Sequence, residues 1–494
     1  MRQIRRGMIS IAAVALFAAT LAAPAAAGPP ERVWLQAVLD RVSTPVQIAV
    51  EEETNLVAAD LFPTRVAAAG LGVQAVTIGS QVLLSDDAFA VHQAEPHIAL
   101  NPTNSAHLLA GAQEGRFFDG GAAGNGYYVS TNGGASWTAG IVPGVSAASG
   151  NPAYERATDP VVAFGPDGTA YFCSLAINIT TVPGAIFVNR WEPTDTGWQA
   201  PDAVVTSETA EHFLDKQWLT VDNGPASPHR GRLYVTWSDF IAPPGNPANL
   251  KKIPIMFASS DDKGETWTSP VKISGGDTYN QGSQPVVAPD GTVHVIYYGF
   301  GKKDMRIVTS RDGGVTWTNP KSAARVVAGG IPGIRTAEEL PTAVVDPLTG
   351  TIVVVWQDAR RDVGDVMFVR STTGGLTWSA PIIVNDGVAG EVQFTPAVAI
   401  RGGVVHVSWH DGRDPAADPT VYTMRYATSS DFGATFGPST AISDPFDIDN
   451  AISTQRGKFL GDYAGLVTTG TSAHPVWVDS RDGENDVWSN TITP

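Results

Sequence analysis

Arginine residues of this 494-residue chain have the type and spacing of groups that bind an anion. Three segments share the pattern W-x-D-x-R, which ends at Arg360, Arg413 and Arg481. A guanidinium group is planar and binds a carboxylate through two parallel hydrogen bonds. With Arg156 and Arg335, these residues predict a site for a carboxylate-bearing ligand. Because the pattern repeats, it fits structural pairing of each arginine with the aspartate two residues before it better than catalysis, with one or two arginines also facing the ligand.

A repeated turn motif indicates the kind of fold that positions these arginines. Residues 310–317 are SRDGGVTW, and related sequences recur at 130–137, 260–267, 371–378 and 429–436, with a degenerate copy at 190–198. In such a motif the Ser and Asp side chains bond nearby backbone N–H groups, Gly takes the positive φ of a tight turn, and the final aromatic packs between sheets. Copies at spacings of roughly 50 to 70 residues predict propeller blades.

A second signature, an extended run that usually opens with a polar residue and proline, precedes these turns. It occurs seven times, beginning at residues 95, 159, 216, 284, 340, 395 and 462. Proline is tolerated at the first residue of a strand, and the apolar run that follows suits a strand buried on both faces. We therefore predict an all-β propeller of four-stranded blades, with seven blades, six being the alternative. The last blade lacks a fourth strand, and we expect residues 81–87 to complete it.

The order of strands divides the predicted blades into two faces. Consecutive strands are antiparallel, so the repeated turns lie on one face, while strand openings and the ends of second strands converge at the opposite mouth. Any site in the central funnel should draw on that mouth. Its expected residues include Glu95, Asp159, Asp215, Lys216, Arg335, Glu338, Glu339, Asp358, His410, Asp411, Asp462, Tyr463 and Asp479.

The turns resemble the Asp-box, or bacterial neuraminidase repeat, of the sialidase superfamily and related propellers. Sialidases hold the substrate carboxylate with three arginines and use a tyrosine nucleophile beside a glutamate, with an aspartate as acid/base. The stretch DYAGL at 462–466 is similar to the tyrosine-bearing strand of that family. The resemblance implies Tyr463 as nucleophile, Glu339 or Glu338 as its partner, Asp159 or Asp215 as acid/base, and a clamp drawn from Arg335, Arg360, Arg413 and Arg481.

The first blade departs from the sialidase pattern, because Glu95 lies near the place where that family has an arginine. A secreted sialidase-like glycoside hydrolase acting on anionic glycans is the expected function. One alternative is a polysaccharide lyase or another glycosidase, with His410 or Tyr463 as base while arginine neutralises a uronate. The other is a non-catalytic propeller that binds a glycan or a protein.

The chain divides into three expected regions: a signal peptide at 1–27, an N-terminal segment at 28–92 and the propeller at 93–494. Residues 1–27 combine a basic start, an apolar run and an A-x-A site, which predicts secretion. Cleavage would change the formal net charge from −17 to −20, which argues against nucleic acid or a membrane surface as partner. We expect a monomer with Cys173 buried. No metal-ligand spacing appears, so we expect neither a metal nor another cofactor.

Overall fold

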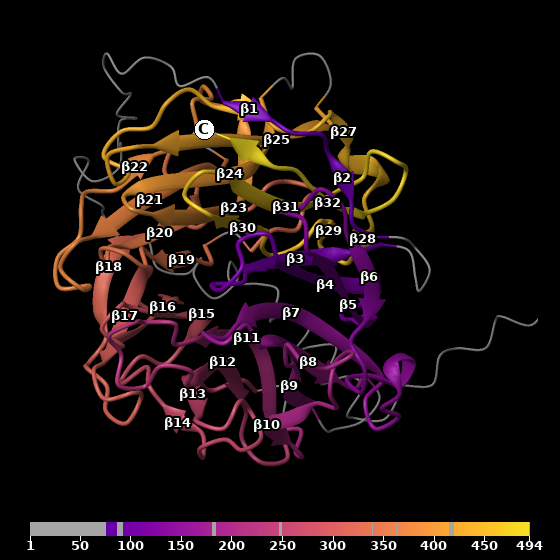
Figure 1. Cartoon of the computed structure of the whole chain (residues 1–494), viewed down its shortest axis with the longest axis vertical. Coiled ribbons are helices and arrows are strands. Elements are labelled where there is room, and N and C mark those ends of the chain that lie inside the picture. The colour runs from indigo at the N-terminus through magenta and orange to yellow at the C-terminus, as the bar shows by residue number, and fades with distance from the viewer. Residues whose placement is uncertain are drawn as a thin grey trace, which may run out of the picture.

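The strands of the protein are arranged around a central axis. The computed structural model describes residues 76–85, 92–179, 184–246, 249–337, 339–361, 363–413 and 419–493. The expected signal peptide and Glu338 lie outside these ranges. In Figure 1 the strand groups follow one another around the axis from indigo to yellow. The all-β propeller predicted from the repeats is therefore confirmed. No helix in the described ranges is long and apolar enough to cross a membrane.

Six groups of four antiparallel strands follow one another, each ordered from the axis outward (Figure 1), and the pairing of Ala122 with Ala157 joins the first two groups into one sheet. Their bounds are β3 (Ala94–Leu100), β4 (Leu108–Arg116), β5 (Ala122–Ser130) and β6 (Thr138–Ile141); β7 (Arg156–Phe164), β8 (Ala170–Ile177), β9 (Gly184–Trp191) and β10 (Asp202–Ser207); β11 (His212–Val221), β12 (Leu233–Ile241), β13 (Ile255–Ser260) and β14 (Val271–Lys272); β15 (Asn280–Val287), β16 (Val293–Gly299), β17 (Asp304–Ser310) and β18 (Lys321–Arg325); β19 (Thr342–Val345), β20 (Ile352–Asp358), β21 (Asp365–Ser371) and β22 (Ile382–Ile383); β23 (Val392–Arg401), β24 (Val404–Gly412), β25 (Val421–Ser429) and β26 (Thr440–Ala441).

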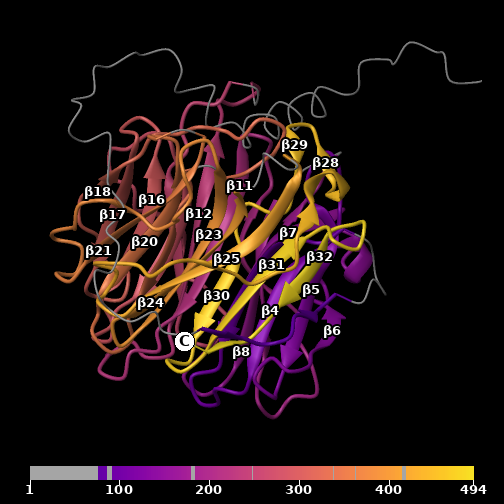
Figure 2. The same ribbon diagram turned by 90° about the horizontal axis from the view of Figure 1, so that it is seen from above.

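The last group takes a strand from the N-terminal side of the propeller. It contains β30 (Gly465–Thr468), β31 (Ala473–Asp479) and β32 (Asp486–Ser489), and β2 (Val82–Leu83) pairs with β32. This strand falls within the segment 81–87 that was expected to complete the last blade. β30 and β31 pack beside β3, and Figure 2 shows yellow β30 to β32 next to indigo β4 and β5. The first and last groups are therefore neighbours around the axis.

Short elements complete the described structure. β1 (Thr77–Ile78) pairs with β33 (Ile492–Thr493), and β27 (Phe446–Asp447) pairs with β25. β28 (Ser453–Thr454) and β29 (Gly457–Lys458) form a small hairpin. The two helical turns are the 3₁₀ segments η2 (Ala147–Ser149) and η3 (Ile448–Asn450). This hairpin lies at the central mouth of the propeller.

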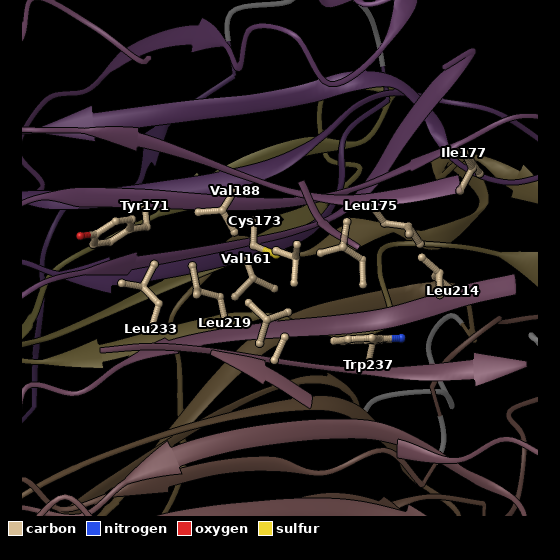
Figure 3. Close-up of a cluster of buried hydrophobic side chains, with 14 of the residues drawn as sticks. Val161, Tyr171, Cys173, Leu175, Ile177, Val188, Leu214, Leu219, Leu233 and Trp237 are labelled. Carbon is tan, nitrogen blue, oxygen red and sulfur yellow. The ribbon is translucent and has the colours of Figure 1, made fainter. Parts of the chain in front are cut away.

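The hydrophobic core consists of layers between neighbouring groups of strands. Figure 3 shows one layer, in which Val161, Cys173 and Leu175 of the second group face Leu219 and Trp237 of the third. All five side chains are buried. Burial raises the pKa of the Cys173 thiol above its usual value, so Cys173 is a small core residue, as expected from the sequence. Burying aliphatic side chains contributes about 1.5–3 kcal/mol per residue.

The repeated turns have the hydrogen bonds that the sequence motif predicts. In the copy at 310–317, Ser310 Oγ accepts from the N–H of Gly314 at 2.8 Å, and Asp312 Oδ1 accepts from the N–H of Thr316 at 2.9 Å. Gly314 has a φ of +94°. A β-carbon there would lie 2.3 Å from the ring of Phe257, so the turn requires glycine for both conformation and space. The indole N–H of Trp317 donates to the Gly314 carbonyl at 3.0 Å.

The strand registers place these turns and the W-x-D-x-R aspartates at opposite ends of the blades. Ser371, which begins one turn, is opposite Ile352 at the start of β20, whereas Asp358 is opposite Asp365 at the far end of the same strand pair. In the next group, Ser429 is opposite Val405 and Asp411 is opposite Thr423. The predicted division into two faces is confirmed for these blades.

Candidate functional site

The inner strands carry an irregularity at the same place, close to the start of each strand. Glu95, Asp159, Lys216 and Thr395 have positive φ values of 55°, 51°, 50° and 49°. In each strand the pairing register shifts across this residue, which marks a β-bulge. Left-handed backbone at residues other than glycine costs of order 1–3 kcal/mol and gathers at functional sites. The bulges bring charged side chains from separate blades to one mouth of the propeller.

Lys216 is the centre of the charged cluster formed there. Its Nζ lies 2.6 Å from Asp462 Oδ2, 2.9 Å from Glu95 Oε1 and 3.9 Å from Asp159 Oδ2. The Lys216 side chain is 10% exposed and all three carboxyl groups are less exposed than that. Arg335 NH2 approaches the same Asp462 oxygen at 3.4 Å. Buried carboxylates need such partners because unpaired charges are costly away from water.

The carboxyl groups of the cluster have opposite tendencies to ionise. Asp462 is buried, but the neighbouring Lys216 and Arg335 lower its pKa below the usual range. Burial raises the pKa of Glu95 to about 8, against the lowering effect of Lys216. Burial, together with the charge of Asp159, raises the pKa of Asp215 to about 8. One mouth thus holds an ionised carboxylate beside carboxyl groups that retain a proton near neutral pH, which is how acid and base roles are separated in active sites.

Three arginines line the same pocket as these acids: Arg116, Arg335 and Arg456. The guanidinium groups of Arg116 and Arg335 lie 4.8 and 4.2 Å from the centre of the Phe459 ring. Burial and the charge of Arg335 lower the pKa of Arg116 to about 10. Arg456 lies in the turn of the β28–β29 hairpin. The backbone N–H of Arg335 donates to the backbone carbonyl of Lys458 in that hairpin at 2.8 Å. Three guanidinium groups around one pocket can bind an anion.

Asp159, Asp215 and Arg335, which sequence reasoning selected, all line this pocket. Asp159 accepts a hydrogen bond from Thr158 Oγ1 at 2.8 Å, and Asp215 accepts one from Gln281 Nε2 at 2.6 Å. These bonds fix the orientation of both carboxyl groups. The structure therefore brings both acid/base candidates to one place.

Tyr463 lies beside the cluster but not with the expected glutamate. Lys216 Nζ is 5.4 Å from the centre of its ring, and its hydroxyl donates to the Pro160 carbonyl at 3.0 Å. Burial raises the pKa of the Tyr463 hydroxyl well above 10. Glu339 is buried elsewhere, where its charge acts on Tyr298. The expected pairing of Tyr463 with Glu339 is therefore corrected, because the backbone of a neighbouring inner strand takes the hydroxyl's hydrogen bond.

The arginines of the W-x-D-x-R pattern do not converge on Tyr463. Arg360 Nε and NH2 bind the two oxygens of Asp358 at 2.7 and 2.8 Å, and Trp356 Nε1 donates to Asp358 Oδ2 at 2.9 Å. Arg360 NH2 also donates to the Arg325 carbonyl at the end of β18, in the preceding group. The arrangement joins one blade to the next.

The other two copies repeat this arrangement. Arg413 binds Asp411 through Nε and NH2, both at 2.9 Å, and reaches Asp386 beyond β22 at 2.8 Å. Arg481 binds Asp479, with Nε to Oδ1 at 2.9 Å. The structural pairing that the repeated pattern favours is therefore confirmed, and the ligand clamp that the sialidase resemblance implied for Arg360, Arg413 and Arg481 is corrected. Arg335 is the member of the expected set that lines the pocket.

His410 is a packed residue rather than a ligand-binding one. Its side chain is buried, and its ring stacks on Phe394 with centroids 4.9 Å apart. Nε2 lies 2.9 Å from the Val478 carbonyl, and burial lowers the pKa of His410 to about 4. The neutral ring joins β24 to β31, which corrects its expected role in substrate binding.

Arg116 and Arg456 are the two arginines of the pocket that the sequence did not predict. Arg116 ends a second strand, a position that had been recognised as facing the mouth in other blades. Arg456 precedes the last inner strand in a hairpin without a repeat counterpart, so no periodic signal marks it. In the described ranges, no three His, Cys, Asp or Glu side chains are grouped so that they could hold a metal ion.

Comparison with known families agrees with the repeated turns. Residues 185–413 match the family described as BNR repeat-like domain. Over this region the chain is similar to that family, and the region includes three of the repeated turns. The resemblance inferred from the boxes is thus confirmed, and the match spans the groups from β9 to β24. No curated protein matches the chain.

Several solved structures resemble this chain at low sequence identity. The Hadza microbial sialidase Hz136 is 14% identical with a TM-score of 0.48, over 83% of this chain and 68% of its own. The leech intramolecular trans-sialidase is 14% identical with a TM-score of 0.46, over 76% and 71%. The α-L-arabinanase of Penicillium chrysogenum is 16% identical with a TM-score of 0.44, over 67% and 94%. Scores at this level do not assign an activity.

Proposed function

We propose that this BNR-repeat propeller is a glycoside hydrolase that acts on glycans carrying an anionic sugar. The observation that carries the proposal is the single pocket in which Asp215, with a raised pKa, and Asp462, with a lowered one, lie among three arginines. Hydrolysis of a glycosidic bond needs a proton donor for the leaving oxygen and a negative group for the positively charged transition state. The two aspartates supply these roles without a metal ion.

Asp215 is the proposed general acid. Its pKa of about 8 keeps it protonated at neutral pH, and a general acid works best when its pKa lies near the working pH. Gln281 Nε2 donates a hydrogen bond to Asp215 Oδ2 at 2.6 Å, which fixes the orientation of this carboxyl group in the pocket. Glu95 also has a raised pKa, but Lys216 and Gln113 both donate to its oxygens. Glu95 is therefore assigned a supporting role, in which its hydrogen bond holds the ammonium group of Lys216 in place.

Asp462 is the proposed negative group. Its carboxylate is ionised because the positive charges of Lys216 and Arg335 lie beside it. A carboxylate at this position stabilises the oxocarbenium character of the transition state or attacks the anomeric carbon. Tyr463 is the second candidate for the nucleophile, and in that role its hydroxyl must leave the Pro160 carbonyl.

Arg116, Arg335 and Arg456 are proposed to bind the anionic group of the substrate. We infer a carboxylate, since guanidinium groups match its planar geometry. A sialic-acid-type sugar is the preferred substrate and a uronic acid the second. Secretion through residues 1–27 is likewise proposed, in keeping with a polymeric or cell-surface glycan as substrate.

A non-catalytic glycan-binding propeller is the second candidate function. The ion pairs of Lys216 with Glu95 and Asp462 favour it, because they occupy the carboxylates within the protein. Purified chain lacking residues 1–27 should be assayed with fluorogenic sialosides, uronides and a neutral arabinoside. We expect release of the fluorophore from an anionic glycoside and loss of that activity in Asp462→Asn. Binding of anionic glycans without turnover of any of them would favour the second candidate.

A further inference from the structure

The loop between β4 and β5 presents an exposed aromatic ring at the rim of the arginine-lined pocket. Phe118 is 55% exposed, and its side chain lines the pocket together with Asp119, Gly120 and Gly121. Single exposed hydrophobic residues are common on protein surfaces. The significance of Phe118 therefore depends on how the loop is held and on what lies next to it.

Arg156, at the start of the neighbouring inner strand, holds the loop in one conformation. Its NH1 binds Asp119 Oδ1 at 2.6 Å and also donates to the Gly120 carbonyl. Its guanidinium lies 4.2 Å from the centre of the Phe117 ring. The N–H of Phe117 donates to the Gly121 carbonyl at 2.9 Å, which closes the loop. The side chain of Arg156 is thus committed to the loop.

The left-handed backbone of the loop requires its glycines. Gly120 and Gly121 have φ values of +114° and +66°. A β-carbon on Gly121 would lie 3.0 Å from Ile177 and 3.3 Å from Arg156. The loop is therefore built from an ion pair, a cation–π contact and two glycines, and the ring at its tip does not take part in packing it. Such a loop presents Phe118 in a fixed orientation without closing over the pocket.

We propose that Phe118 is a stacking platform for the sugar ring that follows the anionic sugar in the substrate. The inference rests on the proposed function, in which the three arginines bind an anionic sugar in the pocket. A pyranose has an apolar face of C–H groups and a polar edge of hydroxyls, so a fixed aromatic face buries the first and leaves the second in water. Phe118 is 55% exposed, whereas the side chain of Arg335, which contacts Asp462, is 13% exposed. The platform therefore contacts the second sugar rather than the first.

The test measures how affinity depends on substrate length. Binding of 3′-sialyllactose and free sialic acid, and of tri- and monogalacturonate, is measured by calorimetry with full-length mature chain carrying Asp215→Asn, so that no probe is consumed. Adding Phe118→Ala should weaken binding of the preferred trisaccharide roughly tenfold and leave the monosaccharide unchanged. Phe118→Tyr should restore the affinity. Arg156→Ala should weaken trisaccharide binding as well, because the loop loses its fixed conformation.

Leu348→Ala is the matched control, since Leu348 is 63% exposed in the β19–β20 turn on the opposite face. It should change neither affinity. Equal weakening of both probe lengths by Phe118→Ala, or no weakening, overturns the platform, as does a protein that binds none of the probes. A length-dependent loss in a protein that hydrolyses no glycoside supports the platform and rejects only the proposed hydrolysis.

Discussion

The ammonium group of Lys216 in the inner strand β11 lies 2.6 Å from Oδ2 of Asp462, which precedes the inner strand β30 and is far away in the chain. The same ammonium group binds Glu95 at 2.9 Å. These contacts join the first, third and last groups of strands at the axis. Lys216 therefore has two roles: it holds Asp462 ionised, and it ties together strands that the ring brings side by side.

Replacing Lys216 with methionine should destabilise the propeller strongly. The change leaves buried carboxylates without their shared cation, and breaking a buried ion pair on one side costs about 3–5 kcal/mol. Urea denaturation followed by tryptophan fluorescence measures the loss. Lys263→Met is the control, because Lys263 binds Asp167 and Glu192 with its side chain 40% exposed. An exposed pair contributes roughly 0–1 kcal/mol, so equal effects of the two substitutions would contradict the role of Lys216.

Substitution of Arg360 should affect mainly stability, whereas substitution of Arg335 should affect mainly activity. Arg360→Ala removes a buried partner of Asp358 and should lower the melting temperature, while the folded fraction keeps its specific activity toward anionic glycosides. Arg335→Ala should lower that activity, mainly by raising KM. Melting curves and kinetics on both variants measure the difference. Loss of substrate affinity in Arg360→Ala at a temperature where it is fully folded would restore Arg360 to the ligand site.

Stability should fall as the pH rises from about 7.5 to about 8.5. Glu95 and Asp215 have pKa values raised to about 8 in the folded protein, so in this window the folded state binds more protons than the unfolded state, and raising the pH favours unfolding. Buried histidines such as His410, with a pKa lowered to about 4, act in the opposite direction mainly below the unfolded histidine pKa of about 6.5. Asp215→Asn should make the decline shallower. A melting temperature that rises across the window would be inconsistent with these pKa values.

Much of the fold could be predicted from local sequence. The turn at 310–317 determines its own geometry, because Ser310, Asp312 and Gly314 bond within the motif. The position of β2 followed from the missing strand of the last group, since an open sheet edge needs a partner. Both inferences depend on interactions that are either local or required by the closed ring.

The site was only partly predictable because it depends on contacts among blades. Asp159 and Asp215 were found, since each opens an inner strand. The partner of Arg360 could be read from its own segment, because the repeated pattern favours pairing with Asp358 two residues before it. The partner of Arg335 could not, because Asp462 belongs to a different blade. Arg456 comes from a hairpin with no repeat counterpart. The repeats thus located the mouth, whereas the ion pairs between different blades, such as Arg335 with Asp462, required the three-dimensional structure.

In the proposed reaction Asp215 donates a proton to the leaving oxygen of an anionic glycoside. The most direct test compares kcat/KM of the wild type and Asp215→Asn on two sialosides, one with a fluorogenic phenol and one with lactose as leaving group. A phenol leaves without protonation, whereas a sugar alcohol needs a proton. We predict that Asp215→Asn loses about 10²- to 10⁴-fold on the lactose-linked substrate and far less on the phenolic one. Equal losses on both substrates, or unchanged rates, would contradict the assignment of Asp215 as the general acid.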